Sequence, residues 1–138
     1  MARGFAYHRR VQFADTDLAG LVHFSMFFRY MEEAEHALWR AAGLTIARAG
    51  ELTGWPRLAA SFEFKAPLRF EEEFEIYVSV THVTRKTMEY EFRIERGEIH
   101  VGDGRIKTAF VSKQPNEPMK ILELPADIVE RLRAAAAD

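Results

Sequence analysis

Residues 13–25 carry the groups in this sequence that are best suited to chemistry. The segment reads FADTDLAGLVHFS and places two carboxylates, Asp15 and Asp17, just before a stretch with a helical pattern. A carboxylate in a loop can act as a nucleophile or a general base, while backbone N–H groups can stabilise an oxyanion. The first turn of a helix has N–H groups without intrahelical partners at the positive end of its dipole. We therefore expect the amides near Phe24 and Ser25 to polarise a carbonyl group close to Asp17.

The same segment also has a purely structural interpretation. An Asp-x-Asp sequence before a helix is often a turn in which the carboxylates accept backbone N–H groups. We expect Asp15 to be such a turn residue. His23 fits a packed or capping role as well as a functional one.

A single long helix is expected to follow, from position 24 to position 42. Its apolar residues recur at steps of three and four, which places them on one face. These apolar positions are Phe27, Met31, Ala34, Leu38 and Ala41. Gly43 is expected to end the helix. The charged residues are expected on the opposite, solvent-facing side: Arg29, Glu32, Glu33, His36 and Arg40.

The rest of the chain follows the two-residue period of strands that have one face toward solvent. Strands are expected at 7–13, at 60–70 with Pro67 at a bulge or edge, at 74–81, at 88–95 and at 99–111. We further expect a hairpin turn at Arg96-Gly97, a bulge at 102–104, one short helical turn at 46–49 and a closing helix at 125–136.

This order of elements predicts a single α+β domain over residues 1–138. A helix with one apolar stripe has to be covered, and the simplest cover is an antiparallel sheet that curves around it. Such a sheet leaves an outer face and an edge without a partner. We therefore expect a dimer or a larger homo-oligomer.

Composition excludes several classes of function. The 138 residues include no cysteine, which excludes thiolate nucleophiles, disulfides and Cys-ligated metals. Nineteen Lys and Arg against 21 Asp and Glu give a net charge of −2, so there is no bulk positive field for nucleic acid. No apolar run approaches the roughly 20 residues of a membrane span, and a cytoplasmic protein is expected. Metal, phosphate-loop, dinucleotide and G-x-S-x-G motifs are absent, so we expect neither a metal nor a redox cofactor.

The run D-T-D-x-x-G-x-V-H at residues 15–23, followed by a helix with aromatic residues and Glu32, resembles the 4-hydroxybenzoyl-CoA thioesterase family of hotdog-fold proteins, including its Tol-Pal-associated branch. The order of elements agrees over residues 5–113. The resemblance implies a five-stranded antiparallel sheet around one central helix, and hydrolysis of an acyl-CoA thioester in a cleft between two subunits. It also implies that Asp17 is the catalytic carboxylate, that the amide of Phe24 polarises the thioester, and that His23 is a supporting polar group.

Two features of the sequence bear on how far this resemblance extends. The Tol-Pal-associated branch usually has a second histidine where this chain has Phe24, so more of the chemistry falls to Asp17. A second clade of hotdog thioesterases uses a helical glutamate, which makes Glu32 and Glu33 alternative acids, although their helical positions favour surface charges.

The phosphates of coenzyme A require basic partners. Similar proteins often place nucleotide-binding cations in the region of Thr84-Arg85-Lys86-Thr87, and we expect Arg85 and Lys86 to have this role. Lys65 and Arg57 are weaker candidates.

Two other functions are compatible with the same fold. A hydratase or dehydratase would need a histidine base on a loop with an extended G-H motif, whereas this sequence offers a carboxylate. A non-catalytic acyl-CoA-binding or assembly module would bind the ligand without turnover.

Overall fold

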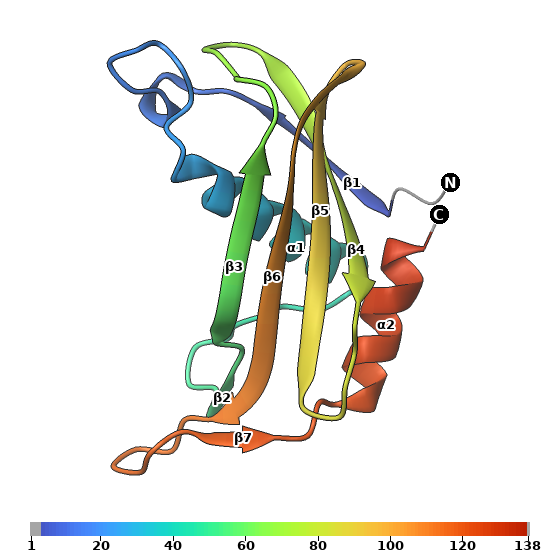
Figure 1. The fold of residues 1–138 in the computed structure, drawn as a ribbon. Helices are drawn as coiled ribbons and strands as arrows, with labels where there is room; N and C mark the ends of the chain where they lie inside the picture. Colours follow the sequence, from blue (N-terminus) through green and yellow to red (C-terminus); the bar gives the residue numbers. More distant parts are fainter. Residues whose placement is uncertain (1–3, 138) are drawn as a thin grey trace.

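A computed structural model describes residues 4–137, so residues 1–3 and 138 of the predicted domain lie outside the described residues. Its strands are β1 (Phe5–Arg10), β2 (Thr53–Gly54), β3 (Arg57–Phe64), β4 (Glu73–Thr81), β5 (Thr87–Arg96), β6 (Ile99–Ser112) and β7 (Lys120–Leu122). The helices are α1 (Met26–Ala41) and α2 (Ala126–Ala136), and one 3-10 turn covers Phe13–Asp15. Figure 1 shows α1 packed across one face of the sheet, with α2 beside β4.

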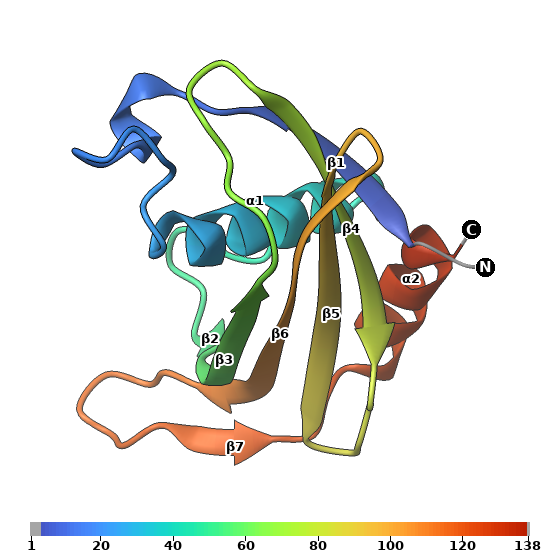
Figure 2. The same cartoon turned by 45° about the horizontal axis from the view of Figure 1, so that its top comes forward.

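The five longer strands form the predicted antiparallel sheet. Their order is β1-β4-β5-β6, and β3 pairs with β6 on the other side. The short strands β2 and β7 pair with the C-terminal end of β6. Turned as in Figure 2, the sheet curves around α1. The predicted α+β architecture, a sheet wrapped around one central helix, is therefore confirmed.

The core lies between α1 and the inner face of the sheet. Tyr30, Met31, Ala34 and Leu38 of α1 are fully buried. The sheet contributes the alternate residues that its pleat directs inward: Ile76, Val78, Met88, Tyr90 and Ile94. Gly104 is required on β6, because a Cβ atom there would overlap the sulfur of Met31 and the ring of Phe62. Most of the predicted apolar stripe is thus confirmed.

Several boundaries differ from those predicted. Ala41 of the predicted stripe is exposed, whereas Glu35 is fully buried. The expected strand at 60–70 is wrong in extent, since β3 ends at Phe64 and the chain turns before Pro67, which has no N–H to donate. The first strand ends at Arg10 and gives way to the 3-10 turn.

Three further differences concern local structure. Residues 46–49 contain no helical turn. The irregularity in β6 lies at Val101 rather than at 102–104, because Ile94 pairs with Gly102 while Glu95 pairs with His100. The short strands β2 and β7 were not expected. Among the described helices, none has the length and apolarity required to cross a membrane.

Candidate functional site

The chemical segment folds as a short antiparallel ribbon between β1 and α1. Thr16 and Val22 form an antiparallel β-bridge. The N–H of Asp17 donates to the carbonyl of Leu21 (2.8 Å), and the N–H of His23 donates to the carbonyl of Asp15 (2.9 Å). Gly20 closes the turn with a positive φ of 81°, a conformation that favours glycine. The ribbon therefore holds Asp17 and His23 at fixed positions on one small unit.

The two oxygens of the Asp17 carboxylate have different surroundings. Oδ1 accepts the N–H of Ala19 (2.9 Å) and, at longer range, that of Leu21 (3.4 Å). Within residues 4–137, Oδ2 accepts no hydrogen bond, and the side chain is exposed. The carboxylate is thus held through one oxygen, while the other faces solvent with its lone pairs free to react.

The backbone amide of Phe24 is available at the start of α1. It donates no hydrogen bond to any described residue, and α1 begins two residues later at Met26. The neighbouring Ser25 amide differs from our expectation, because it donates to Nδ1 of His23 (3.2 Å). Of the two amides expected to polarise a carbonyl, only that of Phe24 is free to do so.

His23 has a capping role in this structure. Its Nδ1 lies 2.8 Å from Oγ of Ser25, and its ring stacks on Phe24 with centroids 4.7 Å apart. These contacts place the imidazole over the first turn of α1. Nε2 has no hydrogen-bond partner among the described residues and is the atom through which His23 could contact a ligand.

An apolar groove of about 310 Å³ lies beside the free amide. Its lining comes from the ribbon, the first turn of α1 and the segment after β3, and is apolar except for Lys65. The apolar residues include Leu21, Val22, Phe24, Phe27, Phe64, Pro67 and Leu68. A chain or ring without charge would match this lining.

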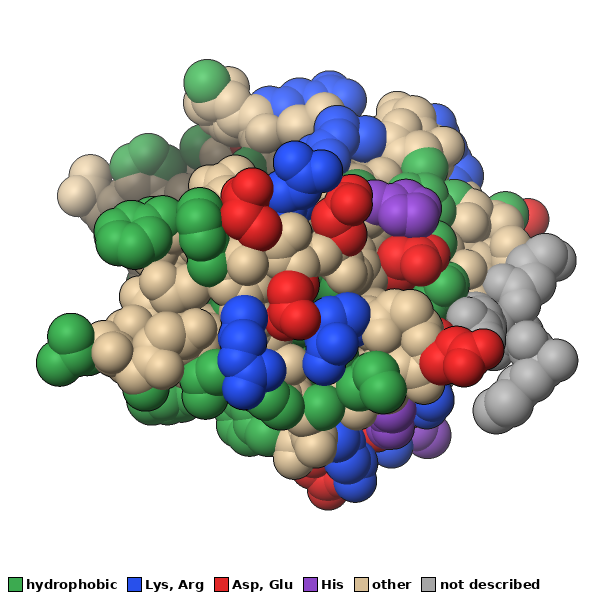
Figure 3. Space-filling view, turned by 90° about the horizontal axis from the view of Figure 1, so that it is seen from above, with side chains coloured by type: hydrophobic (Ala, Val, Ile, Leu, Met, Phe, Trp, Pro, Cys, Tyr) green, Lys and Arg blue, Asp and Glu red, His purple; other side chains and the backbone are tan. Residues whose placement is uncertain are grey.

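Large apolar side chains around the ribbon remain exposed in the single chain. Phe13 is 77% and Phe24 is 63% exposed, and the Phe13 ring contacts Phe70 edge-on at 5.9 Å. Figure 3 looks onto this end of the molecule and shows hydrophobic side chains next to a group of acidic and basic ones. Exposed apolar surface of this kind is typical of a ligand-binding or subunit-contact region.

Asp15 has the structural environment that was expected of it. Asp15 is 4% exposed, and its carboxylate accepts hydrogen bonds from Arg9 (3.0 Å), the Gln12 N–H (3.0 Å) and the Tyr30 hydroxyl (2.9 Å). Burial, followed by the hydrogen bond to Asp15, raises the pKa of Tyr30 well above its ordinary value. The hydrogen bond to Glu33 raises the pKa of the Arg9 guanidinium above its ordinary value.

The two predicted phosphate-binding residues lie far from this ribbon in the same chain. Arg10 pairs with Glu73 at the first residue of β4, and the turn with Arg85 and Lys86 follows the last residue, Thr81. From Glu73 to Thr81, β4 rises about 3.3 Å per residue over eight residues, so its two ends lie roughly 26 Å apart. Figure 1 shows this turn at the bottom of the sheet, with the ribbon at the top left. One chain therefore does not bring Asp17 together with these two cations.

Glu33, an alternative acid, and Lys65, a weaker candidate for phosphate binding, each have a partner of opposite charge. Glu33 accepts hydrogen bonds from Arg9 (2.8 Å) and Tyr7 (3.1 Å). Lys65 lies 3.6 Å from Glu63.

A buried ion pair that the sequence reasoning missed joins α1 to β3. Arg57 contacts both oxygens of Glu35 and lies 3.4 Å from Glu32. The spacing of Glu35 indicates its position, because it lies four residues after Met31 and three before Leu38. Residues at this spacing share one face of a helix, so Glu35 lies on the apolar stripe.

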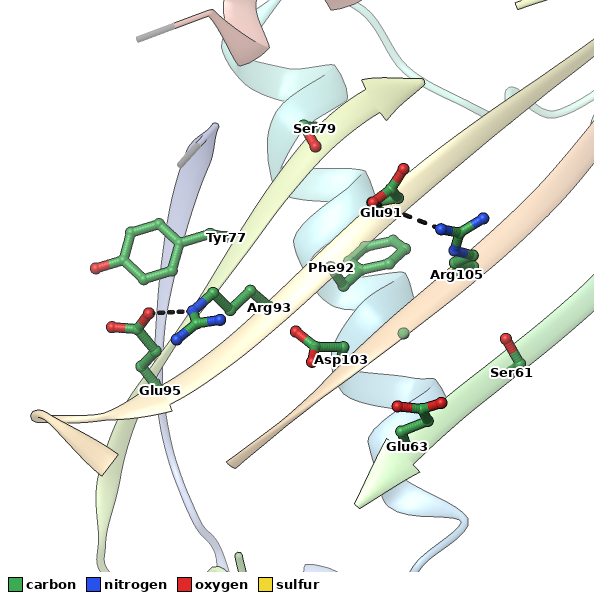
Figure 4. Close-up of a pocket in the computed structure, with 11 residues that line it drawn as sticks. Ser61, Glu63, Tyr77, Ser79, Glu91, Phe92, Arg93, Glu95, Asp103 and Arg105 are labelled. Atoms are coloured by element: carbon green, nitrogen blue, oxygen red, sulfur yellow. Dashed lines mark hydrogen bonds and ion pairs between the residues drawn. The ribbon is translucent and has the colours of Figure 1, made fainter. Parts of the chain in front are cut away.

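A second, larger hollow of about 650 Å³ lies on the outer face of the sheet, away from α1 (Figure 4). Ion pairs cross its floor between Arg93 and Glu95 (2.5 Å) and between Arg105 and Glu91 (3.9 Å). It contains none of the ribbon residues. Among the described residues, no group of three His, Asp or Glu side chains is placed to hold a metal ion.

Comparison with known proteins identifies the family. Residues 11–132 match the model of the thioesterase-like superfamily. The chain is 31% identical over 130 residues to a protein of Aquifex aeolicus (strain VF5) whose name assigns it provisionally to the esterases, with 94% of this chain and 98% of that protein covered. It is 22% identical over 139 residues to 4-hydroxybenzoyl-CoA thioesterase of Pseudomonas sp. (strain CBS-3), with 94% and 98% covered.

A solved structure of a gentisyl-coenzyme A thioesterase shares the fold with a TM-score of 0.82 and 25% identity, over 92% of this chain and 98% of that one. The sheet around α1 is thus the hotdog fold that the sequence resemblance implied. The family match covers most of the chain, and the chain belongs to the thioesterase-like superfamily.

Proposed function

We propose that this protein hydrolyses acyl-CoA thioesters and that the ribbon between β1 and α1 is its catalytic site. One observation carries the proposal. A carboxylate with one tethered and one free oxygen shares a ribbon with an amide that has no partner among the described residues, beside an apolar groove. These are the nucleophile or base, the oxyanion donor and the acyl site that thioester hydrolysis requires. The CoA thioesterases among the relatives support the same reaction.

In the proposed mechanism, the thioester carbonyl accepts a hydrogen bond from the Phe24 N–H. Oδ2 of Asp17 then attacks the carbonyl carbon, or removes a proton from the water that attacks it. The carbon–sulfur bond breaks, and the sulfur of CoA leaves and takes up a proton. In the general-base route, the attacking water supplies the second oxygen of the free acid. Direct attack leaves a mixed anhydride between the acyl group and Asp17, which water then cleaves to the free acid and the Asp17 carboxylate. Single turnover in ¹⁸O water tests for the anhydride, because water that attacks its Asp17 carbonyl carbon leaves the label in Asp17, whereas the general-base route labels the free acid alone.

The groove indicates the class of acyl group. Its aromatic and aliphatic walls match an aryl or fatty acyl chain. The gentisyl and 4-hydroxybenzoyl groups of the relatives' substrates are aryl groups, which supports aryl-CoA as the first class to test.

A second subunit is part of the proposal. Strand β3 pairs with β6 along one side, and the exposed side chains of this edge strand include Leu58 and Phe64. Two such edges could pair across a twofold axis and cover the exposed aromatic residues. Because Arg85 and Lys86 lie roughly 26 Å along β4 from the ribbon, they could hold the nucleotide of a CoA bound there only if another subunit supplies them. Assignment to the Tol-Pal-associated branch stays a prediction.

The function is tested with a panel of aryl and fatty acyl-CoAs, followed by release of free thiol. We expect turnover of at least one aryl-CoA. Tight binding of acyl-CoA without thiol release would instead identify a binding module. Hydration of an enoyl-CoA without thiol release would identify a hydratase.

A further inference from the structure

The candidate site rests on a buried polar network that thioester chemistry does not itself use. Asp15, at its centre, is 4% exposed and Tyr30 is fully buried, while the Arg9 side chain is 12% exposed. All three donors that reach the Asp15 carboxylate bind the same oxygen, Oδ2. They come from β1 (Arg9), from the residue that caps the 3-10 turn (the Gln12 amide) and from α1 (Tyr30), so Asp15 links β1, the turn and α1.

Asp15 is linked to both proposed reacting groups through the backbone. Its carbonyl accepts the N–H of His23 (2.9 Å), which directly precedes Phe24. Two residues after Asp15 is Asp17, which pairs with Leu21 on the opposite arm of the ribbon. A shift of Asp15 would therefore move the carboxylate and the free amide together.

The far side of the network is also fixed. Glu33 accepts two hydrogen bonds from Arg9 (2.8 and 3.2 Å), and the Arg9 guanidinium lies 5.0 Å from the centre of the Tyr30 ring. Apolar residues of similar size often stabilise a core as well as a buried ion pair does, so stability alone does not account for such a network. Burial raises the pKa of Tyr30, so its hydroxyl stays a donor to Asp15 into the alkaline range.

We infer that Tyr30 and Arg9 are positioning residues, which act through Asp15 to hold Asp17 and the Phe24 amide at their working separation. This inference rests on the proposed function. A displacement of about 1 Å in a reacting group can cost about 100-fold in rate, so small movements of the ribbon would be detected as a fall in kcat.

The test compares Tyr30→Phe with Tyr90→Phe. Both substitutions remove a buried tyrosine hydroxyl, but the Tyr90 hydroxyl accepts the N–H of Trp39 and is not bonded to Asp15. We expect Tyr30→Phe to lower kcat by about 10- to 100-fold with KM within about threefold. Tyr90→Phe should leave both within about twofold. Unchanged kcat in folded Tyr30→Phe would overturn the inference.

Two additions keep the test decisive. If Tyr30→Phe does not fold, Arg9→Lys, which keeps the charge but loses the planar donor geometry, should give the same fall in kcat. The ¹H–¹⁵N signals of Asp17 and Phe24 provide a readout independent of turnover. They should move in Tyr30→Phe and stay in place in Tyr90→Phe. If wild type shows no turnover but the Asp17 and Phe24 signals move in Tyr30→Phe, the proposed function is rejected and the positioning role is kept. If these signals do not move, the positioning role is rejected.

Discussion

At the scale of single residues, two aspartates only two positions apart have opposite environments. Asp15 is buried and accepts three hydrogen bonds at Oδ2, whereas Asp17 is exposed and accepts none at its own Oδ2 from residues 4–137. A buried carboxylate with three donors cannot approach a substrate, and an exposed one with a free oxygen can. Their surroundings, rather than their residue type, separate a structural role from a proposed catalytic one.

The buried tyrosines predict a loss of stability in alkali. Burial is the main cause that raises the pKa of Tyr30 and Tyr90 above 10.0 in the folded chain. The folded state then keeps protons that the unfolded chain releases. This contribution to stability is complete below about pH 10 and decreases as the pH rises above it. Urea unfolding at a series of alkaline pH values should show a steeper decline for wild type than for the double variant Tyr30→Phe, Tyr90→Phe. Parallel declines would contradict this assignment.

At the scale of elements, the helices and strands that could be predicted from the sequence are those long enough to show a regular apolar period. Helix α1 and strands β4, β5 and β6 follow from regular apolar spacing over many residues. Strands β2 and β7 have two and three residues, too few to show a period, and exist because β6 extends far enough to pair with them. The Asp17 and Phe24 positions could be recognised from the local motif. The Arg9–Asp15–Tyr30 contacts could not, since they arise only when β1 packs on α1.

The ion pair between α1 and β3 gives a prediction at this scale. Glu35 is fully buried, so Glu35→Gln would leave the Arg57 cation without its main partner. We expect the free energy of unfolding to fall by about 3 kcal/mol in urea titrations. Glu32→Gln is the matched control, because the Glu32 side chain is 44% exposed and should contribute less than about 1 kcal/mol. Equal effects of the two substitutions would show that burial of Glu35 is not what matters.

At the scale of the whole molecule, the single chain exposes apolar surface around its candidate site. The exposed edge of β3 and the aromatic residues near the ribbon account for much of that surface. The distance from Asp17 to Arg85 and Lys86 points the same way. Both features are explained if the functional unit contains at least two subunits.

Assembly is tested at the β3 edge. Leu58 is 50% exposed on that strand, and Leu58→Lys would place a charge in the proposed contact. Sedimentation velocity should show wild type as a dimer or tetramer and the variant shifted toward monomer. Ile121→Lys on β7, at a side chain that is 55% exposed, should sediment as wild type does. A monomeric wild type would contradict the expected assembly.

The most direct test of the central claim is the rate of thiol release by Asp17→Asn on the best acyl-CoA of the panel. Loss of the carboxylate should lower kcat by about 100-fold or more, with thermal unfolding unchanged. Asp127→Asn, at an exposed position in the first turn of α2, should retain wild-type activity. Turnover by folded Asp17→Asn within a few-fold of wild type would contradict the account.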